Sequence, residues 1–230
     1  MDATPSSPIE PLSVIERRIL GTLIEKQKTS KTADTYPLTL NSLTTGCNQK
    51  SNRDPVLELS DDEVEEAIAG LGRKGLTMRM TGGRADRYRH LLYEAWKVSK
   101  VEMAILAELL LRGPQTFGEL RTRASRMDDI ADLETLNALL KSMAERQFVV
   151  FLTDPDRRGA MVTHGFHHSA ELAAARAHAA GLASGTIDSP AVPRAAVDPD
   201  RLTKLEHEVA DLRQMVEDLR RLITERPGLG

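Results

Sequence analysis

The segment TTGCNQKSNRDPV, residues 44–56, gathers the side chains of this chain that are most able to do chemistry. It contains Cys47, the only cysteine among the 230 residues, together with amides, a carboxylate and two cations. A cysteine nucleophile needs a neighbouring base or another group that lowers its pKa, and no histidine precedes His90. We therefore interpret Cys47 as a small buried residue at the end of a helix, and we expect that the protein is not an enzyme.

The polar side chains of the same segment suit either of two roles. Asn, Asp and Ser side chains bond to nearby backbone groups and stabilise irregular loops, so residues 47–56 can form an ordered joint between two helices. The alternative is a functional surface, because loops on a rigid scaffold often carry function. We predict a structural joint that is ordered by its own side-chain hydrogen bonds and that leaves Lys50 and Arg53 exposed.

The histidines of THGFHH, residues 163–168, suggest a metal site. Zinc, however, needs three or four ligands, usually with cysteine or carboxylate support at set spacing, and the sequence has no such spacing. We therefore expect a surface cluster of histidines and no metal. The glycines of TGGRAD, residues 81–86, lack the strand–loop–helix setting of a phosphate-binding motif, so no cofactor is expected either.

Positive charge is local in this chain. The net charge is −3, so any nucleic-acid surface must be a patch. Arginines collect in three places, residues 79–89, 121–126 and 157–158, and those of the two wings, 79–89 and 157–158, fit contact with phosphates or the minor groove. The alternative is a solvated hairpin whose arginines pair with the acidic helix 60–74. The candidate nucleic-acid contacts are Arg79, Arg84, Arg87, Arg89, Lys50, Arg53, Arg121, Arg123 and Arg126.

The elements that must position these residues follow one order twice. Capping boxes of the form S/T-x-x-E mark helix starts, and they begin at Ser13, Ser60, Ser99 and Thr116. A helix capped by Asp132 completes the second group of three. Each group is followed by a hairpin, the first turning at Gly82 and Gly83, and each hairpin ends in a histidine, His90 or His164. We infer an internal duplication of two α+β units of about 75–85 residues.

Three helices followed by a hairpin is the order of a winged helix, a variant of the helix-turn-helix. The predicted fold is therefore mainly α with small β-hairpins (α+β), with two tandem winged-helix domains and a C-terminal coiled-coil helix. We place the domains at residues 12–97 and 98–168, after a disordered leader of residues 1–11. In both domains the third helix lacks basic residues at its start, which argues against simple reading of the major groove by that helix.

The C-terminal part follows a different pattern. Residues 169–197 are interpreted as an Ala-rich segment, helical over 169–183, and a flexible linker. Residues 198–226 then carry apolar residues in steps of three and four, with β-branched residues or Leu at a and Leu at d, which favours a parallel dimeric coiled coil. The alternative is a helix that folds back on its own winged domains. The predicted dimer seam is Leu202, Leu205, Val209, Leu212, Val216, Leu219 and Ile223.

Composition indicates the compartment. One cysteine excludes an internal disulfide and fits a reducing environment. The polar N-terminus is not a signal peptide, and no apolar run approaches the ~20 residues that span a bilayer. We therefore predict a cytoplasmic protein with no membrane partner.

Two long segments carry a family resemblance. EKQKTSKTADTYPLTLNSLTTGCNQKSNRDPV (25–56) and LLLRGPQTFGELRTRASRM (109–127) closely resemble the signature segments of the YceH family, bacterial proteins of largely unassigned function. The resemblance covers roughly residues 12–164 and implies two tandem winged-helix domains, with no established activity. The chain departs from the family at Phe117, usually Pro, and at AMVTHGF (160–166), where the second wing lacks the usual Arg-Tyr ending. A wing contact is therefore expected of the first domain rather than the second.

These observations predict a dimeric tandem winged-helix protein that binds DNA and has a role in transcriptional regulation. The alternative is a protein–protein interaction module, in which the acidic third helices and the loop 47–56 form the partner surfaces.

Overall fold

The computed structural model describes residues 10–30, 32 and 35–184, all of which belong to one compact unit. Residues 1–9 of the predicted leader lie outside the described residues. The same is true of the predicted linker from residue 185 onward and of the C-terminal helix with its whole dimer seam.

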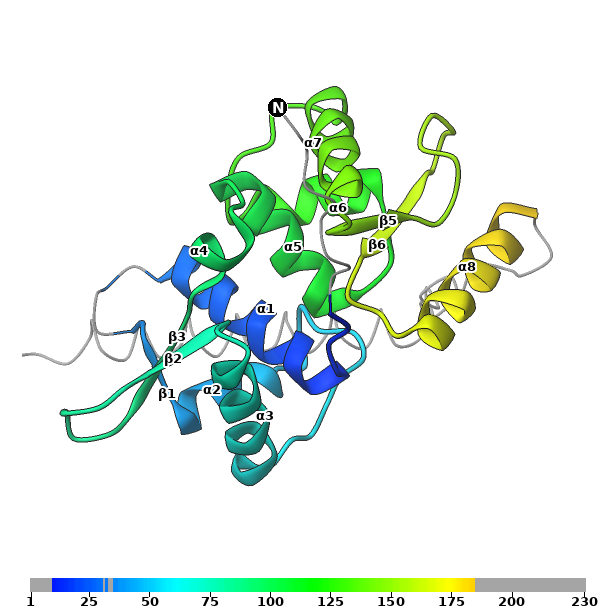
Figure 1. Ribbon diagram of the computed structural model, residues 1–230. Coiled ribbons are helices and arrows are strands. Elements are labelled where there is room, and N and C mark those ends of the chain that lie inside the picture. Colours follow the sequence, from blue (N-terminus) through cyan, green and yellow to red (C-terminus); the bar gives the residue numbers. More distant parts are fainter. Residues whose placement is uncertain (1–9, 31, 33–34, 185–230) are drawn as a thin grey trace, which may run out of the picture. The chain divides into compact units, whose positions relative to one another are not determined.

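A first set of elements extends to residue 96 (Figure 1). Its helices are α1 (Val14–Thr29), α2 (Leu40–Cys47), α3 (Asp61–Arg73) and α4 (Leu92–Trp96), and its strands are β1 (Leu38–Thr39), β2 (Thr77–Met80) and β3 (Arg87–His90). The strands form one antiparallel sheet in the order β1-β3-β2. β3 is central, and Tyr88 pairs with Leu38 on one side and Arg79 on the other.

A second set repeats this order. Its helices are α5 (Lys100–Arg112), α6 (Phe117–Ala124) and α7 (Leu133–Glu145), and its strands are β4 (Gln115–Thr116), β5 (Val149–Phe151) and β6 (Met161–His164). The sheet order β4-β6-β5 matches that of the first set. The α+β prediction is confirmed, and each hairpin is joined by a two-residue strand that the sequence analysis missed. Helix α8 (Ser169–Ser184) follows, as predicted from the Ala-rich segment.

The predicted helix starts are confirmed. In all four capping boxes the Ser or Thr side chain accepts from the N3 backbone N–H, and the N3 Glu accepts from the cap backbone. The Asp132 carboxylate caps α7 by accepting from the Thr135 N–H at 2.7 Å. Each such cap contributes about 1 kcal/mol to helix stability, so these local signals are strong enough to fix where the helices begin.

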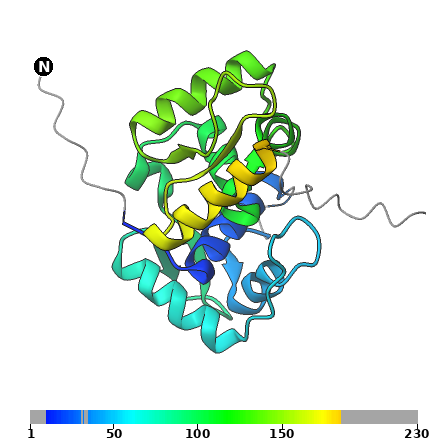
Figure 2. The ribbon, with the colours of Figure 1, turned by 90° about the vertical axis from the view of Figure 1, so that its right-hand side faces the viewer.

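The first helices of the two sets, α1 and α5, pack against each other in the middle of the unit. Figures 1 and 2 both show α2 and α3 of the first set on one side of this pair and α6 and α7 of the second set on the other. Gly21 permits the approach, because an added Cβ would lie 2.8 Å from Leu111 Cγ and 3.3 Å from the Ala107 carbonyl oxygen. Fully buried residues of both helices, such as Leu20 and Leu106, join one hydrophobic core that spans both sets.

Helix α8 is tied to the core by an ion pair. The Arg17 guanidinium on α1 donates two hydrogen bonds of 2.8 Å to the two carboxylate oxygens of Glu171. This pairing lowers the pKa of Glu171 to about 2.

Within the described residues, no helix is both long enough and apolar enough to span a bilayer.

Candidate functional site

The β2–β3 hairpin holds four of the nine predicted nucleic-acid contacts, Arg79, Arg84, Arg87 and Arg89. Arg84 lies exposed in its turn, and Arg87 and Arg89 alternate along β3 with the buried Tyr88 and His90. Alternation places the two arginines on the face opposite Tyr88. Their partners across the strand pair are Met80 and Met78, which are 44% and 41% exposed. The outer face of the hairpin is therefore a strip of arginines and exposed methionines.

Contacts within the first set of elements hold these arginines in place. Arg87 donates to the Pro37 carbonyl oxygen at 2.7 Å, and the Arg89 guanidinium contacts Met78 Sδ at 3.6 Å. Arg79 lies on the opposite face, where its Nε donates to Asp86 Oδ2 at 2.8 Å. Arg79 thus pairs with the carboxylate of its own hairpin, instead of with the acidic helix α3.

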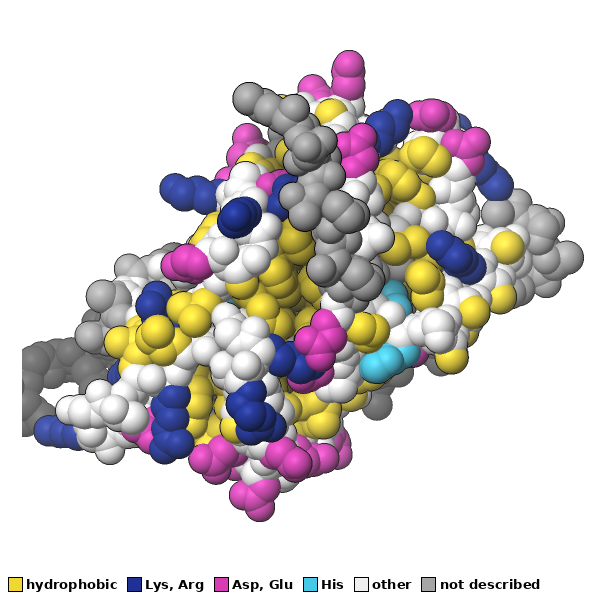
Figure 3. Space-filling model, in the orientation of Figure 1, with side chains coloured by type: hydrophobic (Ala, Val, Ile, Leu, Met, Phe, Trp, Pro, Cys, Tyr) yellow, Lys and Arg dark blue, Asp and Glu magenta, His cyan; other side chains and the backbone are white. Residues whose placement is uncertain are grey.

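The start of α3 is an acidic surface. Asp61, Asp62, Glu65 and Glu66 are all exposed, and Figure 3 shows carboxylates gathered over this helix. Carboxylates near a helix N-terminus stabilise the helix through its dipole, but they repel phosphates. The hairpin and α3 therefore present opposite charges.

The arginines predicted at residues 121–126, in α6 and just after it, have structural partners. Arg121 donates to the carbonyl oxygens of Ile130 at 3.1 Å and Ala131 at 2.7 Å, which ties the α6–α7 connection to the helix. Arg123 donates to Gln115 Oε1 at 2.7 Å. Arg126 is more exposed and lies 3.9 Å from a Glu108 carboxylate oxygen.

The loop between α2 and α3 is an ordered joint, as predicted. The Asn48 amide closes it, donating to the Leu59 carbonyl oxygen and accepting from the Leu59 N–H, both at 2.8 Å. Lys50 is exposed, as predicted. The loop also reaches the second set of elements, because the Asp54 N–H donates to the Leu111 carbonyl oxygen at 3.0 Å and Asn52 Oδ1 accepts from Arg112.

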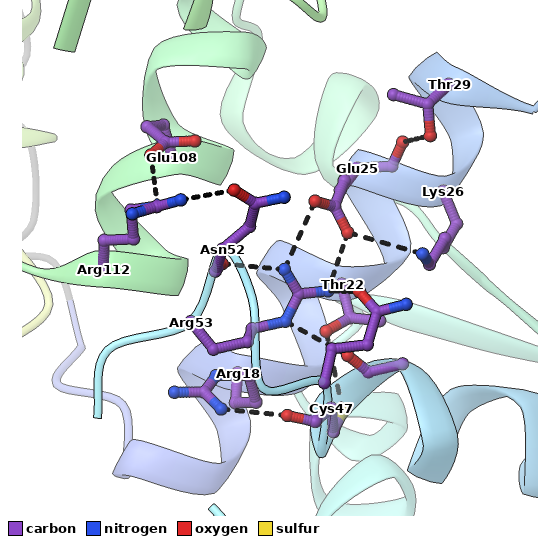
Figure 4. Close-up of polar contacts among 12 residues, drawn as sticks. Arg18, Thr22, Glu25, Lys26, Thr29, Cys47, Asn52, Arg53, Glu108 and Arg112 are labelled. Carbon is purple, nitrogen blue, oxygen red and sulfur yellow. Dashed lines mark hydrogen bonds and ion pairs between the residues drawn. The ribbon is translucent and has the colours of Figure 1, made fainter. Parts of the chain in front are cut away.

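The prediction that Arg53 is exposed is wrong. Its side chain is 0% exposed and lies between the loop and α1 (Figure 4). The guanidinium pairs with both carboxylate oxygens of Glu25, at 2.7 and 3.2 Å, and Nε donates to the Gly46 carbonyl oxygen at 3.1 Å. A guanidinium can be buried when a carboxylate and carbonyl groups satisfy its fork of donors. Arg53 is therefore a structural residue of the joint.

Two carboxylates were missed from the sequence, the half-buried Glu25 and the buried Glu108. Glu25 follows the apolar face of α1, and Glu108 interrupts the apolar run AILAELLL of α5. Glu108 is almost fully buried, and its Oε1 lies 2.9 Å from Arg112 Nε. Burial raises the pKa of Glu108, while Arg112 and two further arginines oppose that rise. The signal in the sequence that could have identified Glu108 was a charged residue inside an apolar helical stretch.

Cys47 is buried at the end of α2, as predicted. It is 0% exposed, and Sγ lies 3.6 Å from Thr22 Oγ1. Burial raises the pKa of the thiol to about 11. The thiol is therefore protonated near neutral pH, because burial outweighs the lowering of its pKa by Thr22, Arg53 and Arg18.

The prediction of a histidine cluster on the surface is wrong for His164, which is 2% exposed. Its ring stacks on His167 with centroids 3.9 Å apart, and burial lowers its pKa well below the usual value. His90, at the end of the first hairpin, has the same role, and burial lowers its pKa to about 4. In each, Nδ1 accepts from the backbone N–H two residues later, at 3.2 and 3.3 Å. Both histidines are thus neutral hairpin anchors.

The part of the chain that the structure describes holds no group of three or more His, Cys, Asp or Glu side chains suited to a metal ion. The candidate functional site is therefore the exposed cationic hairpin, which lies on a scaffold stabilised by buried ion pairs.

Sequence comparison assigns the chain to a family. The chain belongs to the family described as "Protein of unknown function, DUF480", whose model matches residues 12–159. This match confirms the predicted membership of a bacterial family of unassigned function.

Proteins of other bacteria are similar in sequence to this chain, some over nearly its whole length and others over part of it. A UPF0502 protein of Geotalea uraniireducens is 44% identical over 220 residues, covering 93% of this chain and 95% of the relative. One of Pelobacter propionicus is 41% identical over 228 residues, covering 94% and 97%. One of Geobacter sulfurreducens is 56% identical over 136 residues, covering 59% of this chain and 61% of the relative.

Proposed function

We propose that this protein binds DNA through the β2–β3 hairpin and acts in transcriptional regulation. The observation that carries the proposal is the outer face of that hairpin, where Arg87 and Arg89 stand beside exposed methionines and Arg84 lies in the turn. Arginines bind phosphates and enter minor grooves, and apolar side chains next to them can wedge between base steps.

The order of elements supports a tandem winged-helix fold. In each set three helices precede a hairpin, and in each sheet the first short strand pairs with the last strand of the hairpin. We propose that residues 12–97 and 98–168 are the two winged-helix domains. In this proposal the hairpin of the first domain is the wing, and Arg84, Arg87 and Arg89 are its phosphate contacts.

The hairpin is a better candidate for the DNA contact than helix α3. The exposed carboxylates at the start of α3 would lie against phosphates if that helix entered the major groove. Lys50 and Arg126 are exposed and are proposed as secondary contacts. Arg121 and Arg123 keep partners that a phosphate would have to replace, and the buried Arg53 is left out of the proposal.

The test is replacement of Arg84, Arg87 and Arg89 by alanine together. We expect weaker binding to all duplex sequences and a log–log salt slope reduced by roughly 0.9 for each phosphate that an arginine no longer neutralises. Fluorescence anisotropy with a labelled random duplex measures both effects. Circular dichroism verifies the fold, because Arg87 also bonds to Pro37.

A matched control removes the same charge elsewhere. Lys100, Lys141 and Arg176 are exposed on other helices, and their joint replacement by alanine should leave the slope nearly unchanged. Equally weakened DNA binding in both variants would mean that the loss comes from the change in net charge and not from the hairpin. No binding by the intact protein at low salt would contradict the proposal.

The second candidate function is a protein–protein interaction module. The acidic, exposed start of α3 favours it, because that surface suits a basic partner and not a phosphate backbone. Replacing Glu65 and Glu66 with lysine should then abolish capture of a basic protein partner and leave the fold intact. Capture that survives this charge reversal would exclude α3 as the contact.

We also propose that the protein works in the cytoplasm, where cell fractionation should find it.

We further propose that the protein forms a dimer through the C-terminal seam, Leu202 to Ile223. The expected pairing is parallel, with Glu208 at a g position facing Arg213 at the following e position of the partner helix. Light scattering should find a dimer for the full chain. It should find a folded monomer after truncation at Gly185 and in the Leu212→Asp, Val216→Asp variant. A full-length monomer at micromolar concentration would contradict the seam, and a dimer that survives truncation would move the interface elsewhere.

A further inference from the structure

A hollow of about 460 Å³ lies where the two sets of elements meet. Its wall and floor hold three aromatic rings, Trp96 at the end of α4, Phe148 before β5, and Phe166 after β6. Trp96 stacks on Phe166 with centroids 4.8 Å apart and lies 5.8 Å from Phe148. The chain has only eight aromatic residues, one Trp, three Tyr and four Phe, and three of them line this hollow.

Cations surround these rings. Lys74, Lys97 and Arg146 line the hollow, against one carboxylate, Glu10. Lys74 is engaged, because its ammonium lies 3.0 Å from a Glu16 carboxylate oxygen and 3.3 Å from one of Glu10. Lys74 is therefore neutralised by carboxylates and is not available to a ligand.

Arg146 holds the wall in place. Its Nη1 lies 2.8 Å from a Glu102 carboxylate oxygen, and Nη2 donates to the carbonyl oxygens of Trp96 and Lys97 at 3.0 and 3.1 Å. The guanidinium also lies 4.8 Å from the centre of the Phe148 ring. These bonds fix the end of α4, and therefore the position of the Trp96 ring, relative to the second set of elements.

Lys97 is the cation left for a ligand. It ends α4 in the left-handed conformation, with φ 49°, and it is exposed. Among the residues that the structure describes, its ammonium forms no ion pair. An exposed lysine and a half-buried tryptophan that line the same hollow match a molecule with a flat apolar ring and one negative charge.

We propose that this hollow binds a small aromatic monoanion, such as an aromatic carboxylate. The ring lies against Trp96, over the apolar floor of Phe148 and Phe166, and the carboxylate pairs with the Lys97 ammonium. The volume lies within the usual range of roughly 300–1,000 Å³ for small-molecule sites. The proposal does not depend on DNA binding, and it can fail or hold independently of that function.

The test uses the full chain and its single tryptophan, Trp96, as the reporter. The probes are 4-nitrobenzoate, whose nitro group quenches tryptophan emission, and its neutral counterpart, 4-nitrobenzyl alcohol. Free tryptophan supplies the correction for absorption by the probe. We expect saturable quenching by 4-nitrobenzoate, with an affinity about tenfold above that of the alcohol, as a difference of about 1.4 kcal/mol implies.

Variants at Lys97 separate a binding role from a structural role. Lys97→Asn removes the charge and keeps a residue that tolerates the left-handed conformation. It should reduce the affinity for 4-nitrobenzoate about tenfold without changing that for the alcohol, and Lys97→Arg should retain the affinity. Lys100→Ala, an exposed lysine outside the hollow, is the matched control and should bind normally. Equal affinity for the two probes, an unaffected Lys97→Asn variant, or quenching that never saturates would each overturn the proposal.

Discussion

Replacing Arg53 with alanine is expected to lower the free energy of unfolding by about 3–5 kcal/mol, the usual cost of breaking a buried ion pair by removing one partner. The change leaves the Glu25 carboxylate, which is 15% exposed, without the guanidinium that neutralises it. It also leaves the Gly46 carbonyl oxygen without its side-chain donor. Urea unfolding followed by circular dichroism measures the effect on stability.

The neighbouring cation Lys50 supplies the matched control. It lies in the same loop and is exposed, so Lys50→Ala should change stability by no more than about 0.5 kcal/mol. The double variant Arg53→Met, Glu25→Leu should recover part of the stability, because an apolar pair of similar volume carries no unpaired charge. A decrease below about 1 kcal/mol in Arg53→Ala would mean that the loop reorganises and hydrates Glu25.

Gly21→Ala should lower the free energy of unfolding by about 1–3 kcal/mol through overpacking between α1 and α5. The new Cβ would stand 2.8 Å from Leu111 Cγ, which is too close, and Leu111 is itself fully buried and cannot swing into solvent. Thermal and urea unfolding should both report the decrease in stability.

The control for this variant is the same substitution at Gly70, inside α3. Its added Cβ would meet nothing nearer than Arg73 Nη2 at 3.7 Å. Gly70→Ala should therefore stabilise the protein by up to about 1 kcal/mol, the advantage of alanine over glycine in a helix interior. The difference between the two variants isolates the packing cost, and a stabilised Gly21→Ala variant would show that α1 and α5 can separate at little cost.

The two hairpins differ in a way that bears on function. The first carries four arginines between residues 79 and 89, whereas the turn of the second, residues 153–159, has two aspartates beside two arginines. If the protein arose by duplication, the proposed DNA-binding surface belongs to one copy only. The shared α1–α5 core gives the second copy a structural role that does not depend on DNA.

Local features of the sequence determined the helices and hairpins. A capping box such as Ser13 with Glu16 acts over three residues, and helical periodicity acts over a few turns, so both can be found without the fold. The burial of Cys47 and the ordered loop after α2 were also predictable, since small thiols favour interiors and Asn side chains bond to nearby backbone. The two-residue strands β1 and β4 were not, because a segment that short has no period and exists only through pairing with β3 or β6.

Contacts between distant segments decided the rest. Arg53 and Lys50 are both cations in one polar loop, and only the approach of Glu25 from α1 makes one of them buried and the other exposed. His164 was predicted to lie on the surface, but its ring is buried and contacts the rings of Phe166 and His167 in the turn after β6. The aromatic hollow joins residues 96, 148 and 166, which come together only when the two sets of elements pack. Burial of a charge depends on whether a partner arrives to replace water, and that is a property of tertiary structure.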